Sequence, residues 1–179
     1  MPAMPVDKRE LLEKLVDEHY QFLYRYAYRL SGSVHEAEDL TQETYCTAQL
    51  KLDRLIEVAS SRAWLCRILR NHYLARARRP TVVPAGLLDG VQLPAESADR
   101  FEEWEIDQEK LQEALMMLPE PYRSTIVLHY MGEMSYREIA ELLDTPIGTV
   151  MSRLSRAKRF LRAMLMEKRS TASTHATRP

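Results

Sequence analysis

Residues 135–161 have the pattern of two short helices joined by a tight turn, and this pattern constrains the fold more than any other part of the chain. Ser135 can cap a first helix, because its hydroxyl can accept from the Glu138 amide while the Glu138 side chain reaches back to the Ser135 amide. Residues 144–146 (Asp-Thr-Pro) then supply a helix stop, an N-cap hydroxyl and a proline suited to the first helical position. The pattern therefore predicts a second helix from about residue 146, and with it a helix-turn-helix.

The predicted second helix has one apolar face and one face of hydroxyl and guanidinium groups. At about 100° per residue, its apolar residues fall within roughly 60° of one another and point inward; they are Val150, Leu154, Ala157 and Leu161. The opposite half can bond base edges in the major groove, and its flanks can meet phosphates. A solvated amphipathic helix in an ordinary bundle would also show two faces. Residues 145–169, however, carry a net charge of +6, which favours contact with duplex DNA.

Composition and charge favour an all-α protein of two lobes. The chain has 179 residues with 45% hydrophobic content, and it lacks strand-like alternation longer than a few residues. Its net charge of −1 hides a segregation along the sequence, since residues 1–79 carry +2, residues 80–110 carry −6 and residues 111–179 carry +3. Two mildly basic lobes therefore flank an acidic connector.

Before residue 80, three segments repeat apolar residues with a helical period. They are residues 10–30, ended by Gly32; residues 33–50, where Ser33 and Glu36 offer a capping box; and residues 62–78, ended by Pro80. The inner face predicted for the second of these helices is Val34, Ala37, Leu40, Thr44 and Ala48. We therefore expect a first helical domain over residues 1–79.

A stretch with prolines, glycines and no helical period follows, and it indicates a flexible acidic linker over residues 80–100. The second domain is expected over residues 101–169, with helices at about 101–118 and 122–131 before the helix-turn-helix. The small polar residues of 170–179 predict a disordered tail. The expected fold is thus two small helical domains joined by a flexible acidic linker, the C-terminal one with a helix-turn-helix.

Several classes of protein are disfavoured by what the sequence lacks. The five histidines lie in separate segments without metal-ligand spacing, and there is no glycine-rich phosphate loop, so we expect neither an enzyme nor a metal or cofactor site. Cys46 and Cys66 are expected to be reduced thiols. The N-terminus has no apolar signal region and no run approaches 18 apolar residues, so a cytoplasmic protein without membrane insertion is expected.

With both lobes in view, the sequence resembles the bacterial sigma factors, and specifically the compact two-domain group called extracytoplasmic-function (ECF) sigma factors. In the first lobe, AEDLTQETY (37–45) looks like the signature of region 2.2, and AWLCRILRNHYLARARR (63–79) looks like regions 2.3 and 2.4. In the second lobe, residues 118–161 are similar to region 4 throughout. The resemblance covers about residues 10–165 and implies a subunit that binds core RNA polymerase and directs initiation at minus-10 and minus-35 promoter elements.

The resemblance also implies which residues make the contacts with polymerase. Asp39, Gln42 and Glu43 would dock on the coiled coil of the β′ subunit, and a second polymerase contact would be made with the β flap. Independently, the helical wheel turns Asp39 and Gln42 away from the inward Leu40 and puts Glu43 at the border. A solvated acidic face would show the same pattern.

By position, the resemblance assigns the promoter contacts to two sets of residues. The minus-10 set, which would stack bases and track the backbone of a melted strand, is Arg62, Trp64, Arg67, Arg70 and Asn71, with Arg78 as a phosphate contact. The minus-35 set is Thr149, Ser152, Arg153, Arg156 and Arg159. Trp64 fits a core position equally well, because it shares helical spacing with Leu65 and Ile68.

Three interpretations of the whole chain remain beside each other at this point. The resemblance implies a promoter-specificity subunit, held inactive by an anti-sigma factor, whose acidic linker threads through the polymerase cleft or merely spans it as a solvated spacer. A sigma-like decoy would sequester that regulator without reading promoters, and would not need Arg67, Arg70 and Asn71. A plain helix-turn-helix regulator would bind its operator alone and would not need the first lobe.

Overall fold

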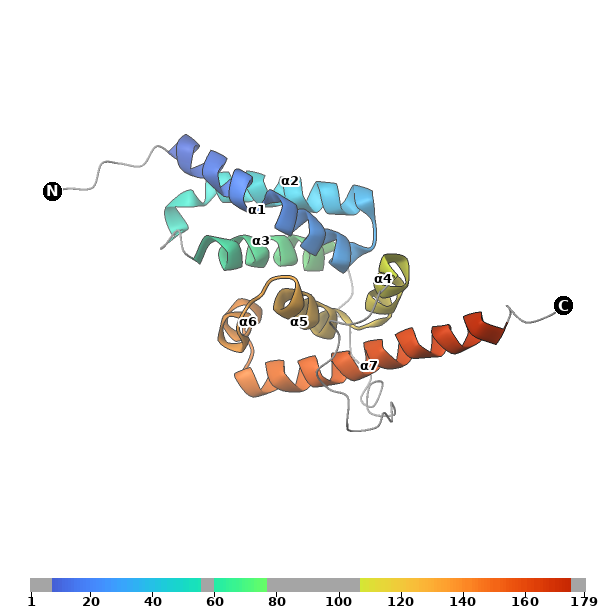
Figure 1. Ribbon diagram of the computed structural model, residues 1–179. Coiled ribbons are helices and arrows are strands. Elements are labelled where there is room, and N and C mark those ends of the chain that lie inside the picture. Colours follow the sequence, from blue (N-terminus) through green and yellow to red (C-terminus); the bar gives the residue numbers. More distant parts are fainter. Residues whose placement is uncertain (1–7, 56–59, 77–106, 175–179) are drawn as a thin grey trace.

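The computed structural model describes residues 8–55, 60–76 and 107–174, and in these ranges it contains seven α-helices, one short 3₁₀ helix (Leu52–Arg54) and no strand. The predicted all-α fold is confirmed. The helices form two lobes that lie one above the other in Figure 1. None of the described helices is long and apolar enough to cross a membrane.

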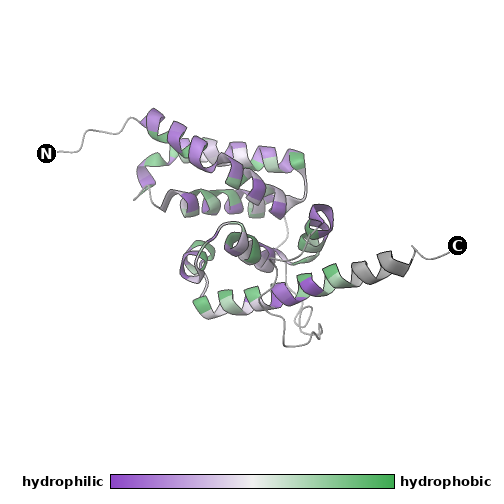
Figure 2. Cartoon of the chain, viewed as in Figure 1, coloured by the Kyte–Doolittle hydropathy of each residue, from purple (hydrophilic) through white to green (hydrophobic). Residues whose placement is uncertain are grey.

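The first lobe consists of α1 (Lys8–Ser31), α2 (Val34–Leu50) and α3 (Ser61–Arg76). These helices pack around fully buried side chains that include Leu23, Tyr26, Leu40, Leu65 and Leu69. In Figure 2 the α1 ribbon is mostly hydrophilic in colour, whereas α3 carries hydrophobic residues along its length. In Figure 1, α3 lies below α1 and α2, on the side of the first lobe that faces the second.

Two details of α2 differ from the prediction. Ser33 Oγ accepts from the Glu36 amide at 3.3 Å, but the Ser33 amide donates to Ser31 Oγ at 3.3 Å. Only half of the predicted capping box therefore forms, because the preceding turn supplies the second acceptor. Val34 is 56% exposed, since it lies at the first residue of the helix beside the α1–α2 turn, and Thr41 is buried on the inner face.

The second lobe consists of α4 (Gln108–Met117), α5 (Glu120–Tyr130), α6 (Tyr136–Leu143) and α7 (Ile147–Thr174). The Asp107 side chain caps α4, and the predicted residues 101–106 of this helix lie outside the described residues. α5 begins two residues earlier than predicted, because Pro121 sits in its first turn, where no amide hydrogen is needed. α7 continues through residues 170–174, which lack glycine and proline, so the tail predicted from residue 170 is helical to Thr174; residues 175–179 lie outside the described residues.

The helix-turn-helix forms as predicted, with a shift of one residue at its second helix. Ser135 and Glu138 make both bonds of the capping box, and Asp144 ends α6 in a left-handed conformation with φ +49°. The Pro146 carbonyl accepts from the amides of Thr149 and Val150. Pro146 therefore lies just before α7 and not at its first position.

The two lobes pack directly on each other, and their buried side chains belong to one continuous apolar cluster. α1 contacts α4 and α5, and α3 contacts α6. At the end of α1, Gly32 has φ +74°, and a Cβ built there would lie 3.0 Å from Sδ of Met116 on α4. The sequence patterns predict two bodies joined by a linker over residues 80–100, and all of this linker lies outside the described residues.

Candidate nucleic-acid interface

The cationic face of α7 points outward, as the helical wheel predicts. Val150, Leu154, Ala157 and Leu161 are all buried against the second lobe. Ser152, Arg156 and Arg159 are exposed on the other side of the helix, and Thr149 is half-buried. The Ser152 hydroxyl donates to the Thr149 carbonyl at 3.0 Å, so its oxygen lone pairs face solvent as acceptors. The helix can therefore enter a DNA groove without unpacking the lobe.

Arg153 differs from the other cations of α7. It is half-buried, and desolvation lowers the pKa of its guanidinium, while the charge of Glu120 on α5 opposes that shift. The Arg153 guanidinium therefore lies near enough to Glu120, at the start of α5, for the two charges to interact. Of the three arginines predicted to contact the minus-35 element, Arg153 is half-buried, whereas Arg156 and Arg159 are exposed.

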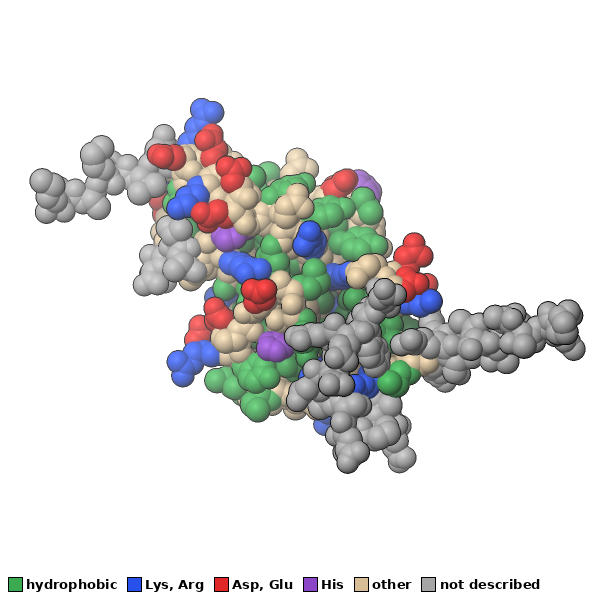
Figure 3. Space-filling model, in the orientation of Figure 1, with side chains coloured by type: hydrophobic (Ala, Val, Ile, Leu, Met, Phe, Trp, Pro, Cys, Tyr) green, Lys and Arg blue, Asp and Glu red, His purple; other side chains and the backbone are tan. Residues whose placement is uncertain are grey.

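Apolar side chains also reach the surface beside the helix-turn-helix. Figure 3 shows hydrophobic atoms over α6 and the start of α7, and the exposed residues in this part of the chain are Tyr136, Ile147 and Met151. On the same face of Figure 3, acidic side chains gather over the N-terminal half of α1.

The two central arginines of α3 are both engaged by the second lobe. Arg70 donates from Nε to Glu120 Oε1 at 2.7 Å and from Nη2 to Glu120 Oε2 at 3.0 Å. The Arg70 and Glu120 side chains are only 17% and 5% exposed. Arg67 is exposed, and its Nη2 donates to the Glu141 carbonyl at 2.5 Å. Both arginines were predicted to hold the minus-10 strand, and in this structure their bonds run to the second lobe.

The other predicted minus-10 residues have varied surroundings. Trp64 is half-buried and packs against the apolar cluster, as the core alternative predicts. Arg62 lies over the ring of Phe22, with its Cζ 4.0 Å from the ring centre. Asn71 is exposed, and Arg78 lies outside the described residues. α3 thus presents Arg67 and Asn71 to solvent, while Trp64 has part of its ring available.

The predicted polymerase-binding residues lie on the outer side of α2. Gln42 is exposed and Asp39 is half-buried, with its Oδ1 4.0 Å from Nδ1 of His35. Glu43 forms an ion pair with Arg76 of α3, with its Oε1 2.7 Å from Nη2 of that residue. The face predicted by the wheel is present, but one of its three members already has a cationic partner.

Sequence reasoning missed the polar residues that join the lobes. Arg123 is 5% exposed and Glu120 is 4% exposed, although both lie on α5 among apolar residues. Arg123 Nη2 donates to the Tyr73 hydroxyl of α3 at 2.9 Å. The available signal was the position of Glu120, Arg123 and Ser124 on the same side of α5 as Val127, which places charged groups on a face that should be buried.

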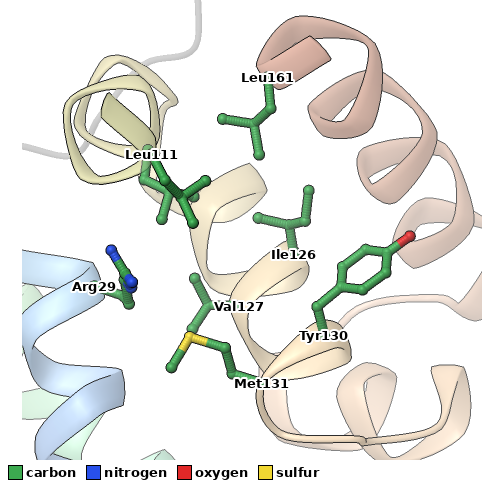
Figure 4. Close-up of a pocket in the computed structure, with 8 residues that line it drawn as sticks. Arg29, Leu111, Ile126, Val127, Tyr130, Met131 and Leu161 are labelled. Atoms are coloured by element: carbon green, nitrogen blue, oxygen red, sulfur yellow. The ribbon is translucent and has the colours of Figure 1, made fainter. Parts of the chain in front are cut away.

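An apolar pocket of about 210 Å³ opens beside this junction. Figure 4 shows side chains of α4, α5 and α7 directed toward it, with Arg29 of α1 at its border. Its lining residues are Arg29, Leu111, Leu115, Ile126, Val127, Tyr130, Met131 and Leu161. Its composition suits an apolar side chain of a partner and offers no cluster of acids or imidazoles; among the described residues, no group of three or more metal-ligating side chains was found.

Comparison with known proteins agrees with this arrangement. Residues 15–81 match the family described as Sigma-70 region 2, and residues 108–161 match the family described as Sigma-70, region 4. These two matches fall on the two lobes in the order found here. The chain belongs to the extracytoplasmic-function sigma factors.

Individual relatives cover most of this sigma factor. It is 32% identical to the ECF RNA polymerase sigma factor SigW of Bacillus subtilis over 86% of the chain and 88% of the relative. It is 34% identical to SigE of Mycolicibacterium smegmatis over 92% of the chain, which spans 65% of that longer protein. Like them, it directs promoter-specific transcription initiation.

Solved structures show the same fold. The sigma factor RpoE, in complex with the anti-sigma factor NepR from Bartonella quintana, is similar with a TM-score of 0.68 and 29% identity, covering 86% of this chain and 96% of that one. CnrH, in complex with the cytosolic domain of CnrY, is similar with a TM-score of 0.64 and 25% identity, covering 90% and 91%.

Proposed function

We propose that the two lobes divide promoter recognition between them, the second reading the minus-35 duplex through α7 and the first capturing the melted minus-10 strand on α3. The observation that carries this proposal is the outward cationic face of α7 within a complete helix-turn-helix. Sigma factors are non-catalytic initiation factors, so the work is done by binding energy.

In the second lobe, the exposed part of α7 supplies two kinds of contact. Arg156 and Arg159 can donate paired N–H groups to guanine or phosphate, and the Ser152 oxygen can accept from a base amino group. The buried row from Val150 to Leu161 anchors the helix, so these groups project from a rigid element. Thr149, at the start of α7, is placed for a base or backbone contact. Arg153, half-buried on the flank of α7, is a further proposed contact.

In the first lobe, α3 combines cations with aromatic surface. Arg67, Arg70 and Asn71 lie on one helix at spacings of three and one, which suits a single strand that crosses the helix. The partly exposed ring of Trp64 can stack on one base while its other side stays in the core. Arg62 and Arg78 are further proposed contacts of the same strand.

Binding to polymerase is proposed at two places. On α2, Asp39, Gln42 and Glu43 offer carboxylate and amide oxygens to a basic surface, which we assign to the β′ coiled coil. On the second lobe, the apolar pocket between α4, α5 and α7 suits an apolar side chain of the β flap. Contacts at both lobes would raise the overall affinity through the shared scaffold.

An anti-sigma factor is the proposed regulator. The two similar solved structures are both complexes, one with the anti-sigma factor NepR and one with the cytosolic domain of CnrY. The exposed recognition face of α7 disfavours a decoy, because a protein that only sequesters a regulator has no use for it.

The direct test is transcription in vitro with purified core polymerase on a library of promoters. We expect the wild-type chain to select templates that share two elements separated by a fixed spacing. A variant with Arg156 and Arg159 both changed to alanine should lose selection at the upstream element and keep binding to core polymerase. If the wild-type chain bound core polymerase but started transcription at no template, the proposed function would be wrong.

A further inference from the structure

The contact between the lobes includes a buried ion pair that uses a proposed DNA-binding residue. Both donor groups on one side of the Arg70 guanidinium point at the two oxygens of Glu120, at 2.7 and 3.0 Å. Ser124 Oγ donates to Glu120 Oε1 at 2.5 Å. This paired geometry is the one that an arginine also uses to hold a phosphate. Glu120 therefore occupies the groups with which Arg70 would bind a DNA strand.

Further polar contacts surround this pair and also join the two lobes. Arg123 of α5 donates to the Tyr73 hydroxyl at 2.9 Å, and Arg29 of α1 donates from Nη1 to Gln112 Oε1 of α4 at 2.9 Å. Arg67 donates to the Glu141 carbonyl of α6. The second lobe thus bonds both central arginines of α3, and the paired bonds of Arg70 to Glu120 must break before those donor groups hold another ligand.

From this arrangement we propose that the chain inhibits itself: while the two lobes are packed on each other, the Glu120 carboxylate takes the place of a backbone phosphate of the minus-10 strand on Arg70. The proposal rests on the function proposed above, because it takes Arg67 and Arg70 as DNA-binding residues. It adds a competitor within the same chain, which acts without any anti-sigma factor.

The chemistry of the contact allows it to open. Separated lobes would expose Glu120, Arg123, Arg70 and Tyr73, and water can solvate each of these groups. Domains of one chain generally move relative to each other unless the interface between them is large and hydrophobic. Since the lobes are connected, Glu120 is present at a high effective concentration and competes well with a dilute DNA strand. Polymerase would shift this balance by binding both lobes in positions that keep them apart.

The test is the binding of a fluorescent single-stranded oligonucleotide carrying the minus-10 sequence to the free full-length chain. Glu120→Gln keeps the shape of the side chain but removes the charge that holds Arg70. We expect it to tighten strand binding by roughly tenfold and to increase the radius of gyration in solution scattering. Glu109→Gln makes the same charge change at an exposed position of α4 and should leave both quantities as in the wild-type chain.

A second variant approaches the same contact from the first lobe. Tyr73→Phe removes the hydroxyl that accepts from Arg123 and leaves Arg70 and Glu120 unchanged. It should tighten strand binding by a smaller factor, roughly threefold, with the helical circular dichroism of the wild-type chain. This variant keeps the test decisive if Glu120→Gln fails to fold.

The outcomes separate this inference from the proposed function. Equal strand affinity of the wild-type chain and the folded variants would overturn self-inhibition, and so would a larger radius of gyration without tighter strand binding. Neither result would touch the proposed function if the wild-type chain still directed initiation with core polymerase. If the wild-type chain with core polymerase started transcription on no template, the proposed function itself would be overturned.

Discussion

Glu43 of α2 and Arg76 of α3 form an ion pair, with Oε1 and Nη2 2.7 Å apart. The other carboxylate oxygen lies 3.5 Å from Nδ1 of His72, whose Nε2 is 2.9 Å from the Thr47 hydroxyl. Glu43 therefore links the helix proposed to bind polymerase to the helix proposed to bind the minus-10 strand. Glu43, which is proposed to bind polymerase from α2, thus also positions the Arg76 side chain of α3.

The ion pair between Glu43 and Arg76 should contribute little to the free energy of unfolding. Because the Glu43 side chain is 47% exposed and that of Arg76 is 31% exposed, solvent screens the pair, and Glu43→Gln should lower the free energy of unfolding by at most about 1 kcal/mol. Urea denaturation measures this change. Arg9, paired with Glu13 along α1, provides a comparison, since Glu13→Gln should have a similarly small effect. A loss several times larger would show that the pair is central to the lobe.

Asp39 and Gln42 provide the test of docking to polymerase. Neither side chain is buried, so changing both to alanine should abolish binding to core polymerase while the unfolding midpoint stays within the error of measurement. A pull-down with the β′ subunit measures the binding. Glu38→Ala, which removes an exposed acid from the same helix, is the matched control and should bind normally. Retained binding by the double variant would reject docking through this face.

Arg156 tests the recognition helix. Its side chain is exposed on α7, so Arg156→Ala should leave the fold intact and weaken binding to the minus-35 duplex by about 1–3 kcal/mol. Affinities of the polymerase holoenzyme for promoter fragments give this value. Arg25→Ala removes an exposed arginine from α1 and serves as the control for charge. If the two variants bound equally well, Arg156 would have no role at this element.

Local signals in the sequence predicted the helices because each depends on near neighbours. The capping box at Ser135 and Glu138, the left-handed stop at Asp144 and the buried row of α7 all involve residues within a few turns of one another. Differences of one or two residues arose at the starts of α5 and α7, and the chain stays helical to Thr174 where a tail was predicted from residue 170.

The contact between the lobes could not be predicted in the same way. Arg70 and Glu120 are 50 residues apart and meet only because the lobes pack, and a helical wheel shows each of them as a charge on its own helix. The wheel places Arg70 on a polar face that faces solvent in a separate lobe, whereas in the structure the Arg70 side chain lies against Glu120 of α5. The outward face of α7 was predictable, because nothing from the first lobe covers Arg156 and Arg159 enough to bury them.

Gly32 supplies a test of the turn that ends α1. Its φ of +74° disfavours any other residue, and a Cβ there would approach Met116 Sδ to 3.0 Å. Gly32→Ala should therefore lower the free energy of unfolding by about 1–2 kcal/mol. Gly148→Ala is the opposite case, since it lies within α7 with no atom within 4 Å of the added Cβ. It should stabilise the chain by up to about 1 kcal/mol, and equal effects of the two changes in urea denaturation would contradict this account.

The two cysteines should differ sharply in reactivity. Cys66 is fully buried in the first lobe, and burial raises the pKa of its thiol to about 12, whereas Cys46 is exposed on α2. Since the thiolate is the reactive form, a thiol reagent at pH 8 should modify one cysteine of the native chain quickly and the second only on unfolding. Cys46→Ser should remove the fast phase. Because the pKa of Cys66 is raised in the folded chain, the unfolded chain loses the Cys66 proton first, near pH 9. The contribution of Cys66 to the free energy of unfolding is therefore complete below pH 9 and declines between pH 9 and 12. Two fast thiols in the folded chain would show that the interior around Cys66 opens readily.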